Sequence, residues 1–354
     1  MILCAVKSGG YAQRKYNVLL NGENNRSLVM NPDIEHSEST IEDFHRKFEK
    51  LFSYDDSDVT FDRVLPRVSE DDEGGQCFQN VACQRSPNHS KFIPLEMFRI
   101  AHLPENHRDY DLYELLKVVA DLTVKVKAKA DRTFRSRMRY TRMHTGCGRL
   151  WNMIKYTDGV NQLGQPHRSS LKTCRCFRCR YSDKPSHIWW EIYVETAANL
   201  ALDDKDKNLS TCAFFYNSSD SPKFVVDDVT VHGVHRDINT CMLKCTTCKP
   251  RLAEKIEQLW RRFDDVWHRV HEKYAGSAEK LAFLVSHPLG SSKHVSVGVW
   301  GGTYQSENDI IDESQSLTYS PCTCSDSYGA YIYIVGYEWG LGGWHQLNKL
   351  ELKY

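Results

Sequence analysis

The chain has 354 residues and a formal net charge of zero, with 46 Lys and Arg residues against 46 Asp and Glu residues. This length allows one to three domains and a large buried core. Zero net charge argues against a protein that binds polyanions over its whole surface, so we do not expect a nucleic-acid partner. No apolar run is long enough to cross a bilayer, and the apolar patch at residues 1–7 is too short for a secretory signal. We therefore expect a cytoplasmic protein with no membrane partner.

The N-terminal part of the chain divides into two segments. Residues 1–90 are polar and rich in loop-forming residues, which predicts an irregular region. A helical segment is expected over residues 91–137. Within it, apolar residues recur at helical spacing over residues 109–130 and predict one packed amphipathic helix. These apolar residues are Leu112, Leu115, Leu116, Val119, Leu122 and Val126.

A basic run overlaps the end of this predicted helix and extends beyond it. It consists of Lys125, Lys127, Lys129, Arg132, Arg135, Arg137, Arg139 and Arg142. Such a run can contact nucleic acid or an acidic membrane. Runs of charge more often simply face water, and we therefore interpret this one as a solvated helix end and loop.

Short segments rich in β-forming residues follow residue 144 and are separated by turn residues. The predicted strands are residues 150–156, 188–194, 212–216, 223–231, 240–245, 280–286, 295–300 and 331–337. Short strands with regular turns are typical of a sandwich or barrel. A helix that begins at Pro250 and ends near Tyr274 interrupts them. Its apolar stripe predicts packing within the domain, although such a stripe can also fill a partner's groove.

The chain contains thirteen cysteines, which in a reducing compartment are expected to be thiols or metal ligands. Three of them stand within six residues, at Cys174, Cys176 and Cys179. Such spacing suits a thiolate cluster around zinc, and a structural Zn²⁺ site requires a fourth ligand. Cys245 and Cys248 are two candidates for it, and Cys212 and Cys241 are others. The alternative is that all five are reduced, partly buried thiols, because cysteine is commonly buried.

Five stretches carry altered versions of one catalytic pattern. Residues 322–330 read Cys-Thr-Cys-Ser-Asp-Ser-Tyr-Gly-Ala before an apolar strand, which resembles the nucleophile loop Gly-x-Ser-Gly-(Gly/Ala)-Pro of trypsin-like serine peptidases. Residues 195–199, Glu-Thr-Ala-Ala-Asn, resemble the Thr-Ala-Ala-His segment of that family. Residues 144–148 resemble the opening of the first barrel in the high-temperature-requirement proteases. Residues 237–244 resemble the segment with the triad acid, and residues 286–298 a hairpin of the second barrel.

The resemblance implies that the catalytic chemistry is lost. It places Asn199 at the general base, Asn239 at the triad acid and Tyr328 at the attacking serine. Asp326 stands at the glycine whose N–H helps to bind the oxyanion. An amide is not a useful base near neutral pH, and a phenol has an ordinary pKa of about 10. An alternative register makes Ser327 the nucleophile, with His235, His287 or His345 as base and Asp237 as acid.

The resemblance covers roughly residues 140–354 and looks closest to uncharacterised trypsin-like proteins of marine invertebrates. It implies an α+β fold with two antiparallel, chymotrypsin-like β-barrels in a domain over residues 138–354. The first barrel is expected over residues 138–249, an inserted helix over 250–275 and the second barrel over 276–354. The expected function is that of a catalytically inactive serine-peptidase homologue that binds a peptide or protein partner. The alternatives are an active serine endopeptidase that uses Ser327 and a zinc-stabilised scaffold module.

Overall fold

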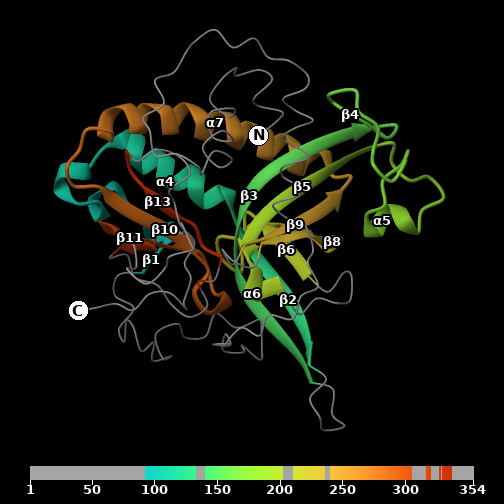
Figure 1. The fold of residues 1–354 in the computed structure, drawn as a ribbon, viewed down its shortest axis with the longest axis horizontal. Helices are drawn as coiled ribbons and strands as arrows, with labels where there is room; N and C mark the ends of the chain where they lie inside the picture. Colours follow the sequence, from blue (N-terminus) through green and yellow to red (C-terminus); the bar gives the residue numbers. More distant parts are fainter. Residues whose placement is uncertain are drawn as a thin grey trace.

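The computed structural model describes residues 92–132, 140–201, 210–235, 240–304, 316–319, 327 and 329–336. These residues form two antiparallel β-sheets and two long helices (Figure 1). One main hydrophobic core contains residues of both sheets and of both helices. The antiparallel α+β architecture that the sequence predicts is therefore present.

The larger sheet has eight strands, in the order β7-β6-β2-β3-β5-β9-β8, with β4 paired to β3. Their bounds are β2 (Thr123–Arg132), β3 (Tyr140–Thr157), β4 (Val160–Asn161), β5 (Ile188–Ala197), β6 (Ser210–Phe214), β7 (Phe224–Val226), β8 (Val229–His235) and β9 (Thr240–Thr247). Side chains alternate between the two faces of a strand. In β9, Leu243 and Cys245 therefore belong to the main core, whereas Met242 packs in a separate cluster on the other face.

The smaller sheet has five strands, in the order β1-β11-β10-β13, with β12 paired to β11. Their bounds are β1 (Ile93–Pro94), β10 (Leu281–Ser286), β11 (His294–Tyr304), β12 (Ser316–Tyr319) and β13 (Ile332–Ile334). Every residue of β10 is buried, because the strand lies between β11 and β13 and is covered on both faces. Phe283 points into the main core, and Leu284 packs in a third cluster with Cys147 of the larger sheet. The two sheets therefore meet at β10.

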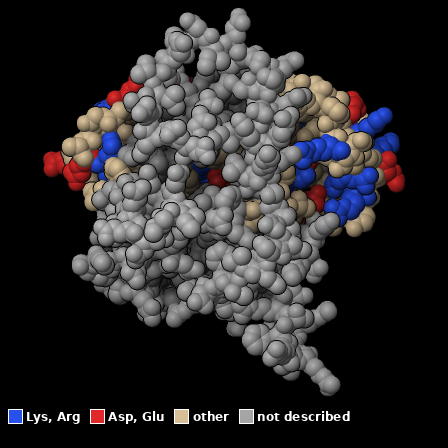
Figure 2. Space-filling view, viewed as in Figure 1, with Lys and Arg blue, Asp and Glu red and all other residues tan. Residues whose placement is uncertain are grey.

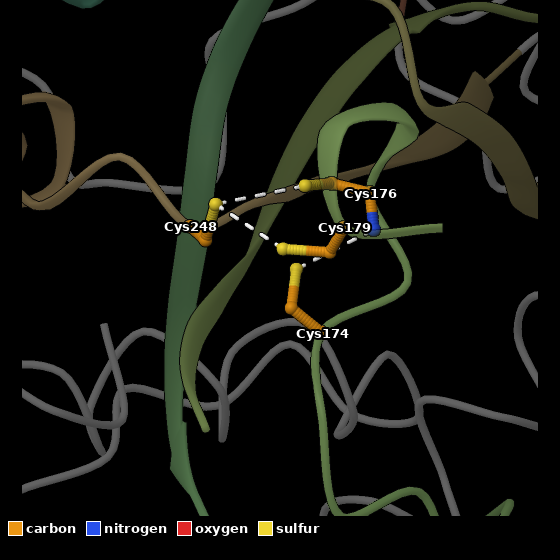
Figure 3. Close-up of side chains that lie close together, drawn as sticks. All are labelled: Cys174, Cys176, Cys179 and Cys248. Carbon is orange, nitrogen blue, oxygen red and sulfur yellow. Dashed lines mark hydrogen bonds between the residues drawn. The ribbon is translucent and has the colours of Figure 1, made fainter. Parts of the chain in front are cut away.

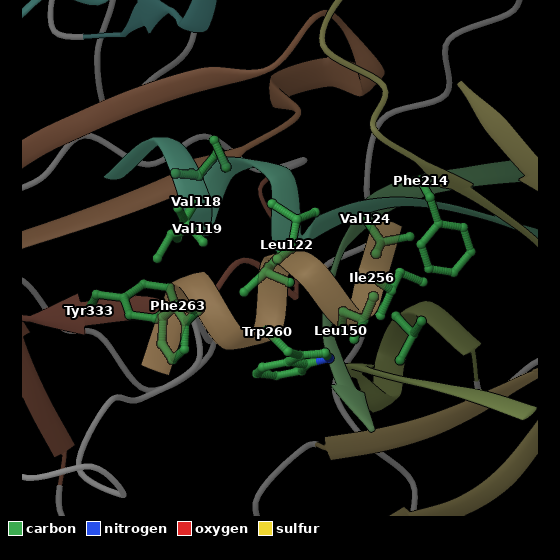
Figure 4. Packing of buried hydrophobic residues seen from close by; sticks show 14 of the residues in the cluster. Val118, Val119, Leu122, Val124, Leu150, Phe214, Ile256, Trp260, Phe263 and Tyr333 are labelled. Carbon is green, nitrogen blue, oxygen red and sulfur yellow. The ribbon is translucent and has the colours of Figure 1, made fainter. Parts of the chain in front are cut away.

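Two long helices, α4 (Tyr110–Leu122) and α7 (Pro250–Tyr274), lie side by side across the sheets (Figure 1). Ion pairs join them: Arg262 to Glu114 at 2.8 Å and Lys273 to Asp109 at 2.7 Å. The apolar face that the sequence predicts for the helix after Pro250 is buried in the main core (Figure 4). Shorter helical elements are η1 (Leu95–Met97), η2 (Ile100–His102), η3 (Glu105–His107), α5 (Phe177–Arg180), α6 (Ala198–Ala201) and η4 (Pro288–Gly290). None of the described helices is long and apolar enough to span a membrane.

The predicted helix over residues 109–130 is wrong in its second half. The helix α4 ends at Leu122, and the chain continues as β2 in the larger sheet. Leu122 and Val126 fit a helical spacing of four residues, but Val124 and Val126 also fit the strand spacing of two. Ten residues of β2 pair with β3, and this long pairing decides between the two patterns.

The basic run is only partly the solvated segment that was predicted. Lys125 lies within β2 and is 3% exposed, and its ammonium group donates a hydrogen bond to the carbonyl of Gly290. Residues 133–139 of the run lie outside the described residues. The described strand paths are open at both ends, so two closed barrels are not observed in the part of the chain that the structure describes.

Candidate metal centre

Four cysteines from two distant segments meet at the outer end of the larger sheet. Cys174, Cys176 and Cys179 lie in the segment between β4 and β5, with Cys179 inside the short helix α5. Cys248 follows β9, just before Pro250 begins α7. The N–H of Cys174 donates to the carbonyl of Ser186 at 2.8 Å, which closes the base of the loop. The sheet therefore brings Cys248 to a loop that carries the other three thiols (Figure 3).

The sulfur positions are close to those of a tetrathiolate metal site. All four Sγ atoms lie within 4.8 Å of one another. The Sγ of Cys248 is 3.7 Å from that of Cys176 and 3.6 Å from that of Cys179. Zinc–sulfur bonds of about 2.3 Å in a tetrahedron place the sulfurs about 3.8 Å apart. A disulfide needs sulfurs about 2.05 Å apart, and all four cysteines are free.

Backbone N–H groups also point at the sulfurs. The N–H of Cys176 donates to the Sγ of Cys174 at 3.4 Å, and the N–H of Ser186 donates to the Sγ of Cys179 at 3.4 Å. Such charge-assisted hydrogen bonds stabilise a thiolate more than a thiol. The loop is thus shaped to hold negatively charged sulfur.

Three of the thiols in the cluster have pKa values shifted in different directions. A hydrogen bond from the Cys174 thiol, supported by the N–H of Cys179, lowers the pKa of Cys176 to about 4. Burial, together with hydrogen bonding to Cys179, raises the pKa of Cys248 to about 12. The hydrogen bond to Cys176 and burial also raise the pKa of Cys174. The Cys176 thiolate is therefore readily formed, and a divalent cation is needed to displace the protons of Cys174 and Cys248.

A buried charge network lies beneath the loop on β5. Glu191 accepts hydrogen bonds from the Tyr193 hydroxyl at 3.1 Å and pairs with Lys244 at 3.1 Å and His167 at 3.2 Å. Burial by itself raises the pKa of Glu191, but these partners outweigh it and lower the pKa to about 2. His167 belongs to the same loop as the cysteines, so this network fastens the loop to the sheet at a second point. This network was not predicted from the sequence, although a lone carboxylate in the apolar run of residues 188–194 is a signal for a buried, paired charge.

Cys245, the fifth predicted ligand, does not join the other four. It lies on the opposite face of β9, in the main core, where it contacts Cys212. Burial and the hydrogen bond with Cys212 raise the pKa of its thiol. An odd offset of three residues along extended chain places Cys245 and Cys248 on opposite sides. The Cys-x-x-Cys spacing therefore contributes one ligand to the cluster, not two.

The stretches with the peptidase resemblance meet where the two sheets join. Gly329 lies against Thr196, because a Cβ built on it would be 2.5 Å from the Thr196 Oγ1 and 2.1 Å from the carbonyl of Cys147. The Thr196 hydroxyl donates to that same carbonyl at 2.7 Å. The N–H of His287 donates to the Sγ of Cys147 at 3.1 Å. Parts of four of the five stretches are therefore neighbours.

The positions assigned to the catalytic triad are described only in part. Asn199 lies in α6, and its side chain is outside the described residues, as are Asn239, Asp326 and Tyr328. Ser327, the nucleophile of the alternative register, is fully buried, and its hydroxyl contacts that of Ser286 at 3.3 Å.

Of the candidate bases in the alternative register, only His287 has a side chain that the structure describes. His287 is fully buried, and its Nδ1 contacts the carbonyl of Ser291 at 3.2 Å. Burial, with Lys293 and Lys125 nearby, holds its pKa well below the usual value. His345, Asp237 and the side chain of His235 lie outside the described residues.

Comparison with known proteins gives no family assignment from sequence. No family model matches the chain, and no curated protein matches it. Among solved structures, Deg5 overlaps 65% of this chain and 81% of its own, with 10% identity and a TM-score of 0.34. The HtrA-type protease AlgW, solved with a decapeptide, overlaps 62% of this chain and 54% of its own, with 7% identity and a TM-score of 0.31. At these values the overlap does not assign this chain to a peptidase family.

Proposed function

We propose that the protein is a non-catalytic binding module whose outer loop is held in place by a structural zinc ion. Cys174, Cys176, Cys179 and Cys248 would be its ligands. The observation that carries this proposal is the convergence of four sulfur atoms within 4.8 Å from segments that are far apart in the sequence. Four thiolates around one ion make a closed site, which is typical of structural rather than catalytic zinc.

The zinc ion would stabilise a segment that has little regular secondary structure. The segment between β4 and β5 contains only one turn of helix, α5, as regular structure. A metal that links this segment to Cys248 would therefore contribute folding energy directly. Soft thiolate ligands favour zinc or iron over magnesium and calcium.

Elemental analysis of the purified full-length chain tests this proposal. We expect about one zinc per chain and little iron. Titration with a strong chelator is expected to remove the zinc, lower the melting temperature and expose the four thiols to Ellman's reagent. A folded chain that contains no stoichiometric metal, or a melting temperature unchanged by chelation, would refute the proposal.

A second candidate function is that of an inactive serine-peptidase homologue that binds a peptide or protein partner between the two sheets. The contact of Gly329 with Thr196 and Cys147 supports it, because the resemblance pairs these same segments. The residues that the resemblance assigns to the base and the nucleophile, Asn199 and Tyr328, lack the required chemistry. A fluorophosphonate probe is expected to leave the chain unlabelled. Covalent labelling that Ser327→Ala abolishes would instead establish an active peptidase.

A further inference from the structure

The helix α5 and the residue that follows it present two aromatic side chains to solvent. Phe177 is 65% exposed and Tyr181 is 75% exposed, and their ring centroids lie 5.5 Å apart with the ring planes at 70°. Large aromatic side chains usually supply buried area, so two adjacent exposed rings indicate a surface that contacts something else. Cys179, between them in sequence, is buried in the four-cysteine cluster. The cluster thus fixes the side of α5 from which the two rings project.

The segment that carries these rings is strongly basic, although the whole chain is neutral. Residues 162–187 contain six Lys and Arg residues against one Asp, a net charge of +5. The six cationic residues are all exposed: Arg168, Lys172, Arg175, Arg178, Arg180 and Lys184. Zinc with four thiolates carries a charge of about −2, which leaves the loop at about +3. Lys and Arg side chains gather on this side of the molecule (Figure 2).

Arg180, the last residue of α5, also has a structural role. Arg180 pairs with Asp228 at 3.1 Å, next to the edge strand β8, and so fastens α5 to the sheet. Arg175 and Arg178 flank Phe177 in the sequence and are exposed. The surface therefore combines fixed aromatic rings with cations within a few residues on either side.

We propose that this surface binds single-stranded nucleic acid. In this arrangement bases stack on Phe177 and Tyr181, and phosphates contact Arg175, Arg178 and Lys184. The proposal rests on the zinc-stabilised loop of the proposed function, because the ion holds the rings and cations on one rigid turn. It identifies the class of partner that the outer loop of the proposed binding module would bind.

The combination of rings and charge selects this partner over others. Base–aromatic stacking needs an unpaired base with an open face, which duplex DNA or RNA does not offer. An acidic peptide would satisfy the arginines but would leave the exposed rings without a planar partner. A single strand supplies alternating planar bases and phosphates, which match an exposed ring flanked by two arginines. Two rings and about three phosphate contacts make a small site with strong salt dependence, with a slope of log K against log salt of about −2.

Fluorescence anisotropy with a labelled twelve-nucleotide oligo-dT or oligo-U measures the binding, with the full-length zinc-loaded chain at low salt. We expect the double variant Phe177→Ala/Tyr181→Ala to weaken binding by at least about tenfold. Arg175→Gln/Arg178→Gln is expected to weaken binding and to make the salt slope shallower by about 1.4 units. The matched controls are Tyr110→Ala, an equally exposed aromatic on α4, and Arg261→Gln on α7, neither of which should change affinity.

Zinc content and melting temperature are measured for every variant, so that this inference and the proposed function are tested separately. A wild-type chain with one zinc that binds no oligonucleotide at low salt overturns the inference alone. Equal binding of a matched duplex or of poly-glutamate, or binding that survives the aromatic double variant, also overturns it in favour of a non-specific polyanion surface. Aromatic-dependent binding by a chain without zinc supports the surface and refutes only the proposed role of the ion.

Discussion

The thiol of Cys248 lies 3.6 Å from that of Cys179, although 69 residues separate them in the sequence. Cys245, only three residues before Cys248, lies on the other face of β9 against Cys212. The end of the strand therefore divides one Cys-x-x-Cys pair between the loop-covered cysteine cluster and the main core. This division gives a matched pair of substitutions.

The substitution Cys248→Ser is expected to abolish stoichiometric metal binding and to lower stability by on the order of 4 kcal/mol, because loss of a structural metal belongs to the large-effect class of changes. Cys245→Ser is expected to keep the metal. Its cost comes only from a hydroxyl in an apolar site, about 1–3 kcal/mol. Elemental analysis and urea denaturation of both variants make the comparison. Loss of metal in Cys245→Ser, or its retention in Cys248→Ser, would contradict the ligand set.

Gly329→Ala is expected to be strongly destabilising. Gly329 has a φ of +74°, and a new Cβ would stand 2.1 Å from the carbonyl oxygen of Cys147. Backbone must therefore move where the two sheets join, at a cost of about 3–4 kcal/mol. Gly164 is the control, because its φ is +81° and a Cβ there would meet nothing within 4 Å. Gly164→Ala should cost only about 1 kcal/mol from the left-handed backbone. Equal melting temperatures for the two variants would show that the close approach at Gly329 is absent in solution.

Local patterns predicted some of these features and left others open. The apolar stripe after Pro250 has a single interpretation as a helix, and α7 follows it. At Val124 and Val126 the helical and strand periods both fit, and only pairing with β3 decides. The sequence indicated three clustered thiols from their spacing, but the fourth depended on where β9 ends. Long-range pairing is invisible in a single sequence, because the free energy that selects it comes from contacts between distant segments.

Glu191 is expected to stabilise the protein in a pH-dependent way. Its partners lower its pKa from 4.5 to about 2, so the folded state favours the carboxylate. The contribution is therefore complete above about pH 4.5 and is lost as the pH falls towards 2, and it amounts to about 3 kcal/mol. Glu191→Gln should lose most of this free energy at pH 7 and much less near pH 3. Urea denaturation at both pH values makes the measurement, and an equal loss at both would exclude the charge of Glu191 as the cause.

Lys293 gives the opposite pH dependence. It is fully buried, and burial lowers its pKa from 10.5 to about 8. The unfolded chain binds this proton more tightly, so stability should rise as the pH rises from about 8 to 10.5. Below pH 8 the buried charge costs about 3 kcal/mol, and the hydrogen bond that Lys293 donates to the carbonyl of Ala120 returns about 1 kcal/mol.

At neutral pH, Lys293→Met therefore removes a buried charge whose cost is larger than the stabilisation from the lost hydrogen bond. We expect the variant to be more stable than the wild type by about 2 kcal/mol at pH 7, with the advantage gone above about pH 10. Lys172→Met, at an exposed position, is the control and should change stability little at either pH. Thermal or urea denaturation across this range provides the measurement. A Lys293→Met variant that is less stable at pH 7 and equally so at pH 10 would mean that the hydrogen bond to Ala120, rather than the buried charge, dominates at this site.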